Sequence, residues 1–171
     1  IIGVKFLREV LVEQDATIEG ASLLENGTVG RRATVGVDVR AEDFILAEDS
    51  KVKGGAIVER CYVGANTILS NGFTAVDSLF FANCHCENGE AAAIFAGPYT
   101  VSHHKSSLLI AGVFSFFNAG SGTNQSNHLF KSGAVHQSVH LRGTKFVSSA
   151  YVMSPAMEGP CTVVLGRQRR H

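Results

Sequence analysis

The residues best suited to chemistry lie in one stretch, VSHHKSSLLIAGVFSFFNAGSGTNQSNHLFK, which runs from Val101 to Lys131. It contains three histidines, two lysines and three asparagines around an apolar run. An imidazole titrates near neutral pH and can act as the general base for a hydroxyl or an amine. An amide can stabilise a developing oxyanion, and a lysine can contact a phosphate as a compact point charge. The stretch therefore predicts a site for a small-molecule or sugar ligand.

Two of these histidines, His104 and His128, are the candidate catalytic bases, and the sequence does not choose between them. His103 and His104 are adjacent, so on an extended strand their side chains would point to opposite sides. His128 instead follows a run of amides and hydroxyls that begins at Asn124. A base at either position must lie within hydrogen-bond reach of the group that it deprotonates.

The other candidates would bind the ligand without taking a proton from it. Their amides would orient the ligand or stabilise an oxyanion, and their lysines would contact an anion such as a phosphate or pyrophosphate. These candidates are His103, Lys105, Asn124, Asn127, Lys131 and His136. The alternative interpretation is structural, because the composition of NAGSGTNQSN is also that of ordinary turns.

A second group of polar residues precedes this stretch, in CHCENGE at 84–90. Cys-His-Cys lacks the ligand spacing of a zinc site and has no second pair, so we predict no metal. Alternating inward and outward side chains on a strand explain it more simply. Glu87 and Glu90 flank Asn-Gly and are predicted to mark a solvated turn. Because no secretory signal is seen, the four cysteines are expected to be thiols in a reducing, cytoplasmic compartment.

The elements that must position these residues are predicted from a repeat. Aliphatic residues recur about every six positions; they are Val12, Ile18, Leu24, Val29, Val35, Val52, Val58, Val63 and Leu69. A period of six fits neither an amphipathic helix nor a single long strand. It is typical of an all-β fold, a prism-shaped parallel β-helix, in which three hexapeptides form a coil of about 18 residues. The aliphatic residues are expected to face the interior of this prism.

The repeat divides a single domain, residues 1–171, into three parts. A first repeat block covers residues 12–80, the period lapses over residues 87–131, and a second block covers residues 133–166. Val163 falls two residues out of the register of the second block. The residues predicted to face inward in that block are Val135, Leu141, Val147 and Met153. Because loops on a rigid scaffold tend to carry binding chemistry, the irregular insertion at 87–131 is the candidate site-bearing segment.

The composition excludes two classes of partner. Fifteen basic and fifteen acidic residues leave no net charge, so we expect no concentrated basic face for nucleic acid or a membrane surface. No apolar run approaches the roughly 20 residues that cross a bilayer as a helix. The chain opens on Ile-Ile and is expected to be a segment of a longer protein.

Four segments resemble an uncharacterised family of long bacterial hexapeptide-repeat proteins, a domain of unknown function. They are ENGEA, GPYTVSHHKSSLLIAG, FSFFNAGSGTNQSNHLFKSGAVHQ and YVMSPAMEGPCTVVLGR. The resemblance extends from about residue 15 to the end of the chain. It places the chain in the left-handed β-helix superfamily. It implies a left-handed parallel β-helix with an irregular insertion, and a homo-oligomer, the trimer of that superfamily.

The superfamily is best known for acyltransferases and sugar-nucleotide enzymes, whereas the family itself has no established activity. The resemblance therefore implies a transferase, of acyl or nucleotidyl type, that acts on a sugar or nucleotide-sugar. A coenzyme A thioester would be the donor in an acyl transfer. Two alternatives stay open: a non-catalytic module that binds carbohydrate or another ligand, and a purely structural trimeric β-helix. Analogy at the level of the fold does not decide among the three.

Overall fold

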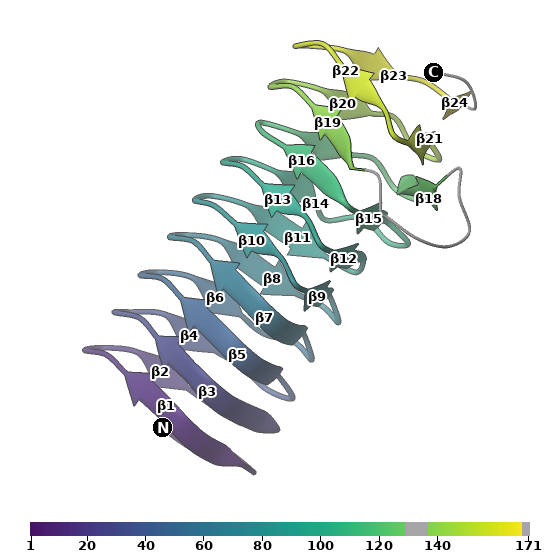
Figure 1. Cartoon of the computed structure of the whole chain (residues 1–171). Helices are drawn as coiled ribbons and strands as arrows, with labels where there is room; N and C mark the ends of the chain where they lie inside the picture. Colours follow the sequence, from purple (N-terminus) through teal and green to yellow (C-terminus); the bar gives the residue numbers. More distant parts are fainter. Residues whose placement is uncertain (129–136, 169–171) are drawn as a thin grey trace.

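The structure is a computed structural model that describes residues 1–128 and 137–168, with the backbone alone for Asn127 and His128. The regular structure of the described residues is all β, and the paired strands run parallel to one another. The chain winds into a stack of coils, and its two ends lie at opposite ends of the stack (Figure 1). The predicted fold class, an all-β parallel β-helix, is confirmed. Among the described residues, no helix is present that would cross a membrane.

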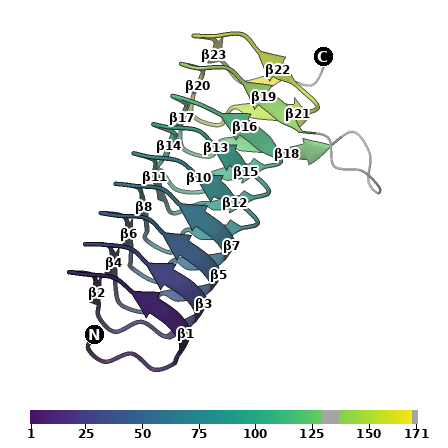
Figure 2. The same ribbon diagram turned by 60° about the vertical axis from the view of Figure 1, so that its left-hand side comes forward.

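Each coil contributes strands to three faces of the stack, which we call A, B and C (Figure 2). Face C is a nine-stranded parallel sheet among the described residues. Its strands are β2 (Thr17–Ile18), β4 (Thr34–Val35), β6 (Lys51–Val52), β8 (Ile68–Ser70), β11 (His85–Glu87), β14 (Val101–Ser102), β17 (Asn118–Ala119), β20 (Lys145–Phe146) and β23 (Val163–Val164).

Faces A and B form one continuous sheet that bends between them. Four long strands cover both faces and bend at a residue with positive φ in the middle; they are β1 (Leu7–Val12), β3 (Leu23–Val29), β5 (Arg40–Leu46) and β7 (Ile57–Val63). Further along the chain the two faces have separate strands. Face A has β9 (Thr74–Val76), β12 (Glu90–Ala92), β15 (Leu108–Ile110), β18 (Asn124–His128), β21 (Tyr151–Ser154) and β24 (Arg167–Gln168). Face B has β10 (Leu79–Phe80), β13 (Phe95–Ala96), β16 (Gly112–Phe114), β19 (Ser138–His140) and β22 (Met157–Glu158).

The interior of the first repeat block contains the aliphatic residues that the sequence predicts, together with the buried rings of Phe44, Phe73 and Phe80. Ile18 pairs with Val35, and Val35 with Val52, so equivalent residues lie directly above one another. The coil in this block is therefore slightly shorter than the three full hexapeptides that the sequence predicts. The predicted inward residues are at most 1% exposed apart from Val12, which is partly buried in the first coil.

The predicted register of the second repeat block is wrong by one residue. Leu141 and Val163 are exposed, whereas the adjacent His140 and Val164 are buried. The inward residues of this block also include Phe146 and Val152, in place of Val147 and Met153. On a strand, a shift of one residue exchanges the inner and outer faces. Apolar residues occupy both faces here, so the pattern does not fix the register; Val135 lies outside the described residues.

The coils continue through most of the segment that was predicted to be irregular. Residues 87–131 include the strands from β12 to β18, which pair with strands of neighbouring coils; the register shifts once, between β18 and β21. One coil is longer than the others. On face C, Asn118 pairs with Val101 in the coil before it and with Lys145 in the coil after it, and Lys145 is further from Asn118 along the chain than Val101 is. The extra length falls between β18 and β19, where residues 129–136 lie outside the described residues. The insertion is therefore shorter than residues 87–131.

Candidate functional site

Three histidines from two neighbouring coils form a row on face C, which we call the histidine row: His85, His103 and His104. β11 and β14 pair through His85–Val101 and Cys86–Ser102, so His103 follows β14 one position beyond this pairing, next to Glu87. The ring centroids of His85 and His103 are 5.5 Å apart. Those of His103 and His104 are 4.4 Å apart, with the rings edge to face. The adjacent histidines do not point to opposite sides, because β14 ends at Ser102 and the chain turns there.

Glu87 fixes one end of the histidine row. Its Oε1 atom accepts hydrogen bonds from His85 Nε2, at 2.9 Å, and from Ser70 Oγ, at 2.7 Å. Its Oε2 atom accepts one from Asn71 Nδ2, at 3.0 Å. The hydrogen bond from His85 is the main reason why the pKa of Glu87 lies below its ordinary value, and Ser70 and Asn71 lower this pKa further. The predicted turn is present as a bend at residues 88–89 between β11 and β12, with the exposed Glu90 after it, whereas the Glu87 side chain before it is not solvated but orients His85.

His103 is the middle and half-buried member of the row. Asn88 Nδ2 donates a hydrogen bond to the backbone carbonyl of His103, at 3.2 Å, which fixes the chain where it leaves β14. Burial is the largest cause of a lowered pKa for His103, and the neighbouring His104 and His85 lower it further. The imidazole of His103 is therefore neutral at neutral pH and can accept or donate a hydrogen bond.

The lowered pKa of His103 gives a testable pH dependence. Between its folded-state pKa and its ordinary value of 6.5, the unfolded chain binds more protons than the folded chain, so stability falls as the pH is lowered through this window. We expect His103→Asn to remove this contribution and to flatten the decline of the thermal midpoint between pH 7.5 and 5. Melting curves of both proteins across this range measure it, and identical pH profiles would contradict it.

The comparison with family models covers the whole chain, residues 1–171, and matches a domain of unknown function, DUF4954. The chain belongs to the DUF4954 family. The comparison with curated proteins found no match. The expectation of an uncharacterised β-helix family is confirmed by the match and the fold together.

This DUF4954 chain brings together only part of the predicted site within the residues that the structure describes. His103 and His104 share the row, and Lys105 follows them as an exposed residue. Asn124 lies elsewhere, at the start of β18 on face A, where its Oδ1 accepts a hydrogen bond from Ser126 Oγ. Asn127 and His128 lie further along β18, and their side chains are outside the described residues. Lys131 and His136 are outside them entirely.

His85 and Glu87 are the site residues that the sequence reasoning missed. The alternation in CHC is confirmed, since Cys84 and Cys86 are buried and His85 faces outward. Burial raises the pKa of both thiols, so neither is a ready nucleophile. The coil length was the available signal, because Ser70, Glu87 and His103 follow one another in the sequence at intervals of about one coil. Among the described residues, no three His, Cys, Asp or Glu side chains are arranged to hold a metal ion.

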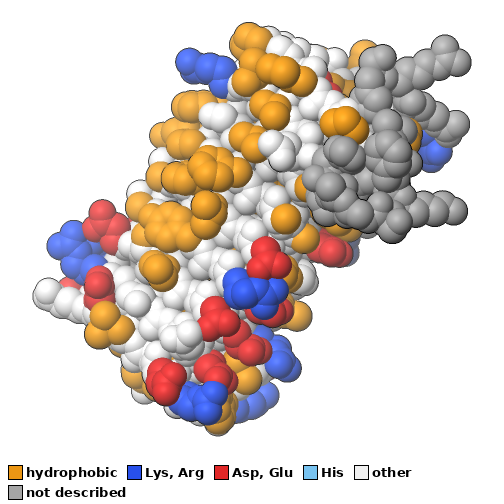
Figure 3. Space-filling view, viewed as in Figure 1, with side chains coloured by type: hydrophobic (Ala, Val, Ile, Leu, Met, Phe, Trp, Pro, Cys, Tyr) orange, Lys and Arg blue, Asp and Glu red, His pale blue; other side chains and the backbone are white. Residues whose placement is uncertain are grey.

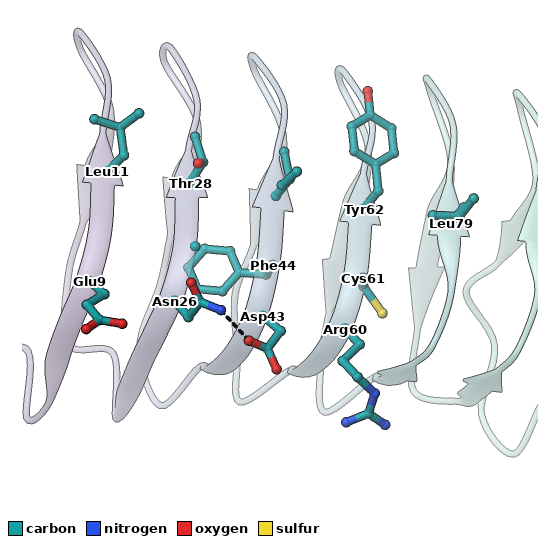
Figure 4. Close-up of a pocket in the computed structure, with 12 residues that line it drawn as sticks. Glu9, Leu11, Asn26, Thr28, Asp43, Phe44, Arg60, Cys61, Tyr62 and Leu79 are labelled. Carbon is teal, nitrogen blue, oxygen red and sulfur yellow. Dashed lines mark hydrogen bonds between the residues drawn. The ribbon is translucent and has the colours of Figure 1, made fainter.

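A groove of about 510 Å³ crosses the first five coils on face B and the bend beside it (Figure 4). One edge carries Asn26, Asp43 and Arg60, and the other carries apolar side chains such as Leu11 and Leu79. The three residues of the polar edge already pair with protein groups: Asn26 Nδ2 donates to Asp43 Oδ1 at 2.6 Å, and Arg60 pairs with Asp77 at 2.5 Å.

The floor of this groove offers little chemistry of its own. The ring of Phe44 lies over Gly27, where a Cβ would come within 2.5 Å of the ring. Burial raises the pKa of the Cys61 thiol to about 11, so it is not a thiolate near neutral pH. The histidine row is therefore the better candidate site for chemistry in this DUF4954 chain.

Proposed function

We propose that this DUF4954 β-helix is a transferase that binds a sugar or nucleotide-sugar at the histidine row and transfers an acyl group to it, with His104 as the general base. The observation that carries the proposal is the row itself: three imidazoles in contact, anchored at one end by the carboxylate of Glu87. Glu87 fixes the orientation of His85, and the ring contacts from His85 to His103 and from His103 to His104 connect that fixed end to the proposed base.

His104 suits the role of base because it is the exposed end of the row. The neutral His103 ring beside it can hold a substrate hydroxyl by a hydrogen bond while His104 takes its proton. His128, the other candidate, is the last residue of β18 on face A, at the end of that strand away from face C. Because His128 lies away from the histidine row, the structure favours His104 over His128 as the proposed base.

The proposed step balances with a coenzyme A thioester as the acyl donor. The His104 imidazole removes the proton of the acceptor hydroxyl, and the oxygen attacks the thioester carbonyl carbon. The carbon–sulfur bond then breaks, and the departing thiolate takes the proton from the imidazolium. The products are an ester and the free thiol of coenzyme A. Lys105, adjacent and exposed, would contact the phosphate of a nucleotide-sugar or of the donor.

A binding module without catalysis is the second candidate. Glu87 favours it, because its two oxygens already accept three hydrogen bonds from the protein and are committed to structure. In that case the row would hold a sugar by hydrogen bonds from neutral imidazoles, with no proton transfer.

The test combines binding with turnover. Thermal shifts with acetyl-coenzyme A, UDP-N-acetylglucosamine and glucosamine report binding, and release of free thiol from acetyl-coenzyme A reports transfer. We expect His104→Ala to lower the rate of thiol release by about 10²–10⁴-fold. Lys51→Ala, an exposed residue of β6 on the same face, is the matched control and should keep full activity. Sugar binding without thiol release would establish the second candidate, and the absence of any binding would overturn both.

A further inference from the structure

Face B carries a continuous column of outward apolar side chains, one from each coil, which we call the apolar column. Its members are Leu11, Thr28, Ile45, Tyr62, Leu79, Phe95, Val113, Val139 and Met157. Thr28 is the one small polar residue among them, and no member carries a charge at neutral pH. The space-filling view shows apolar side chains gathered over the later coils of this face (Figure 3).

The equivalent column on face C is different. Its outward residues are Thr17, Thr34, Lys51, Ile68, His85, Val101, Asn118, Lys145 and Val163, a mixture of charged, polar and apolar types. A face that only meets water has no need of an apolar residue at nearly every position. The contrast between the faces therefore indicates that face B is covered.

Aromatic side chains widen the apolar column at the corner between faces B and C. Phe81 packs against Phe95, with ring centroids 4.7 Å apart. The exposed rings of Tyr99 and Phe116 stack at 5.1 Å, and the Arg142 guanidinium lies 5.0 Å from the centre of the Phe116 ring. Aromatic residues and arginine are enriched, and other charged residues depleted, in the buried centres of protein interfaces.

We propose that face B is the surface through which this chain docks on another copy of itself. The first argument is size. Nine strands at a spacing of about 4.8 Å make the apolar column roughly 38 Å long, and the corner aromatics make it about 15 Å wide. A pair of such faces covers about 1,100 Å², which passes the roughly 1,000 Å² that a specific interface needs.

The second argument is the regular spacing of the apolar column. Its side chains follow one another at the strand spacing over the whole length of the stack. A partner can fill the gaps between successive rows along this length only if its own surface repeats at the same spacing. Another copy of the chain does so by construction, and sheet faces pack in this way with interdigitated side chains.

This assembly is independent of the proposed transferase activity. The histidine row lies on face C, so its residues do not belong to the apolar column. The number of copies is a separate question, and the trimer that the resemblance implies is one arrangement that could use face B.

The test is the mass of the full chain in solution, measured by light scattering and by sedimentation between about 1 and 100 μM. We expect a whole-number multiple of the chain mass. Leu79→Lys combined with Phe95→Lys is expected to give the single-chain mass, because it places two charges at the centre of the apolar column. Ile57→Lys on face A is the matched control: Ile57 and Leu79 are both 40% exposed, and the control should keep the assembly.

A second variant tests the proposal even if the double variant fails to fold. Met157 is 73% exposed, so Met157→Lys leaves the interior untouched and should weaken the assembly at least 10-fold. Circular dichroism verifies that each variant is folded. A wild-type chain that stays single at 100 μM would overturn the proposal. So would an assembly that persists in folded Leu79→Lys with Phe95→Lys, or one that Ile57→Lys dissociates equally well.

Discussion

Val35→Asp is expected to lower the free energy of unfolding by about 4 kcal/mol or more, enough to leave much of the chain unfolded at 37 °C. Val35 has no exposed surface and lies inside the prism between Ile18 and Val52, its partners in the coils before and after. The interior around it is aliphatic and offers no hydrogen-bond donor to a carboxylate. Because each coil is held by its neighbours, the loss also weakens the coils on either side.

The matched control for this prediction is the preceding residue of the same strand. Thr34 faces outward on β4, so Thr34→Asp places the same charge on the surface and should change the free energy of unfolding by less than about 1 kcal/mol. Urea titrations followed by circular dichroism give both values. Equal stability of the two variants would contradict the assignment of inward and outward residues from which the whole prism was derived.

The inward residues of the first block were predictable where their neighbours on the strand are polar or glycine. Val35 is flanked by Thr34 and Gly36, so the pattern has a single solution. In the second block the inward His140 precedes the outward Leu141, and the outward Val147 follows the inward Phe146. Two features hide the register here: the inward His140 is polar, and the apolar Leu141 and Val147 stand directly after an inward residue. Hydrophobicity alone could not separate the two sides.

The candidate site was predictable only in part, since it is assembled between coils. His103 and His104 stand out in the sequence as a pair, but Glu87 and His85 lie one coil earlier and meet them through the pairing of β11 with β14. The length of the coil, which is slightly less than three hexapeptides here, decides which residues become neighbours. An error of one residue in the assumed coil length accumulates over several coils and moves every predicted contact between them. The exact coil length therefore matters more than a sequence motif for predicting which residues meet.

His140 is the buried polar residue whose substitution is expected to have the largest effect on stability. Its ring is 1% exposed and stacks on Phe114, with centroids 4.9 Å apart and planes 15° apart. Phe146 meets the ring edge to face, with centroids 5.0 Å apart. Its Nδ1 atom pairs with Glu158, one coil further on, while Nε2 has no hydrogen-bond partner among the described residues. The rings of Phe114 and Phe146 thus pack around His140, which pairs with Glu158 in the next coil.

His140→Ala is expected to lower the free energy of unfolding by about 3–5 kcal/mol, because it opens a cavity between the rings and leaves the Glu158 carboxylate without its partner. His140→Phe keeps the ring and should cost less, since only the partner of Glu158 is lost. Adding Glu158→Leu to His140→Phe should return stability to within about 1 kcal/mol of the wild type or above it, as exchanges of buried pairs for apolar residues often do.

Urea titrations of the three variants separate the cost of the cavity from the cost of leaving Glu158 without its partner. If the double variant stays as unstable as His140→Phe, the polar pair has a structural role that apolar packing cannot replace, for example in fixing the register between β19 and β22. If it recovers, the last coils need only the volume of the ring. The pair itself would then lower the stability of a region that an all-apolar interior would hold better, which is the usual mark of residues retained for something other than folding.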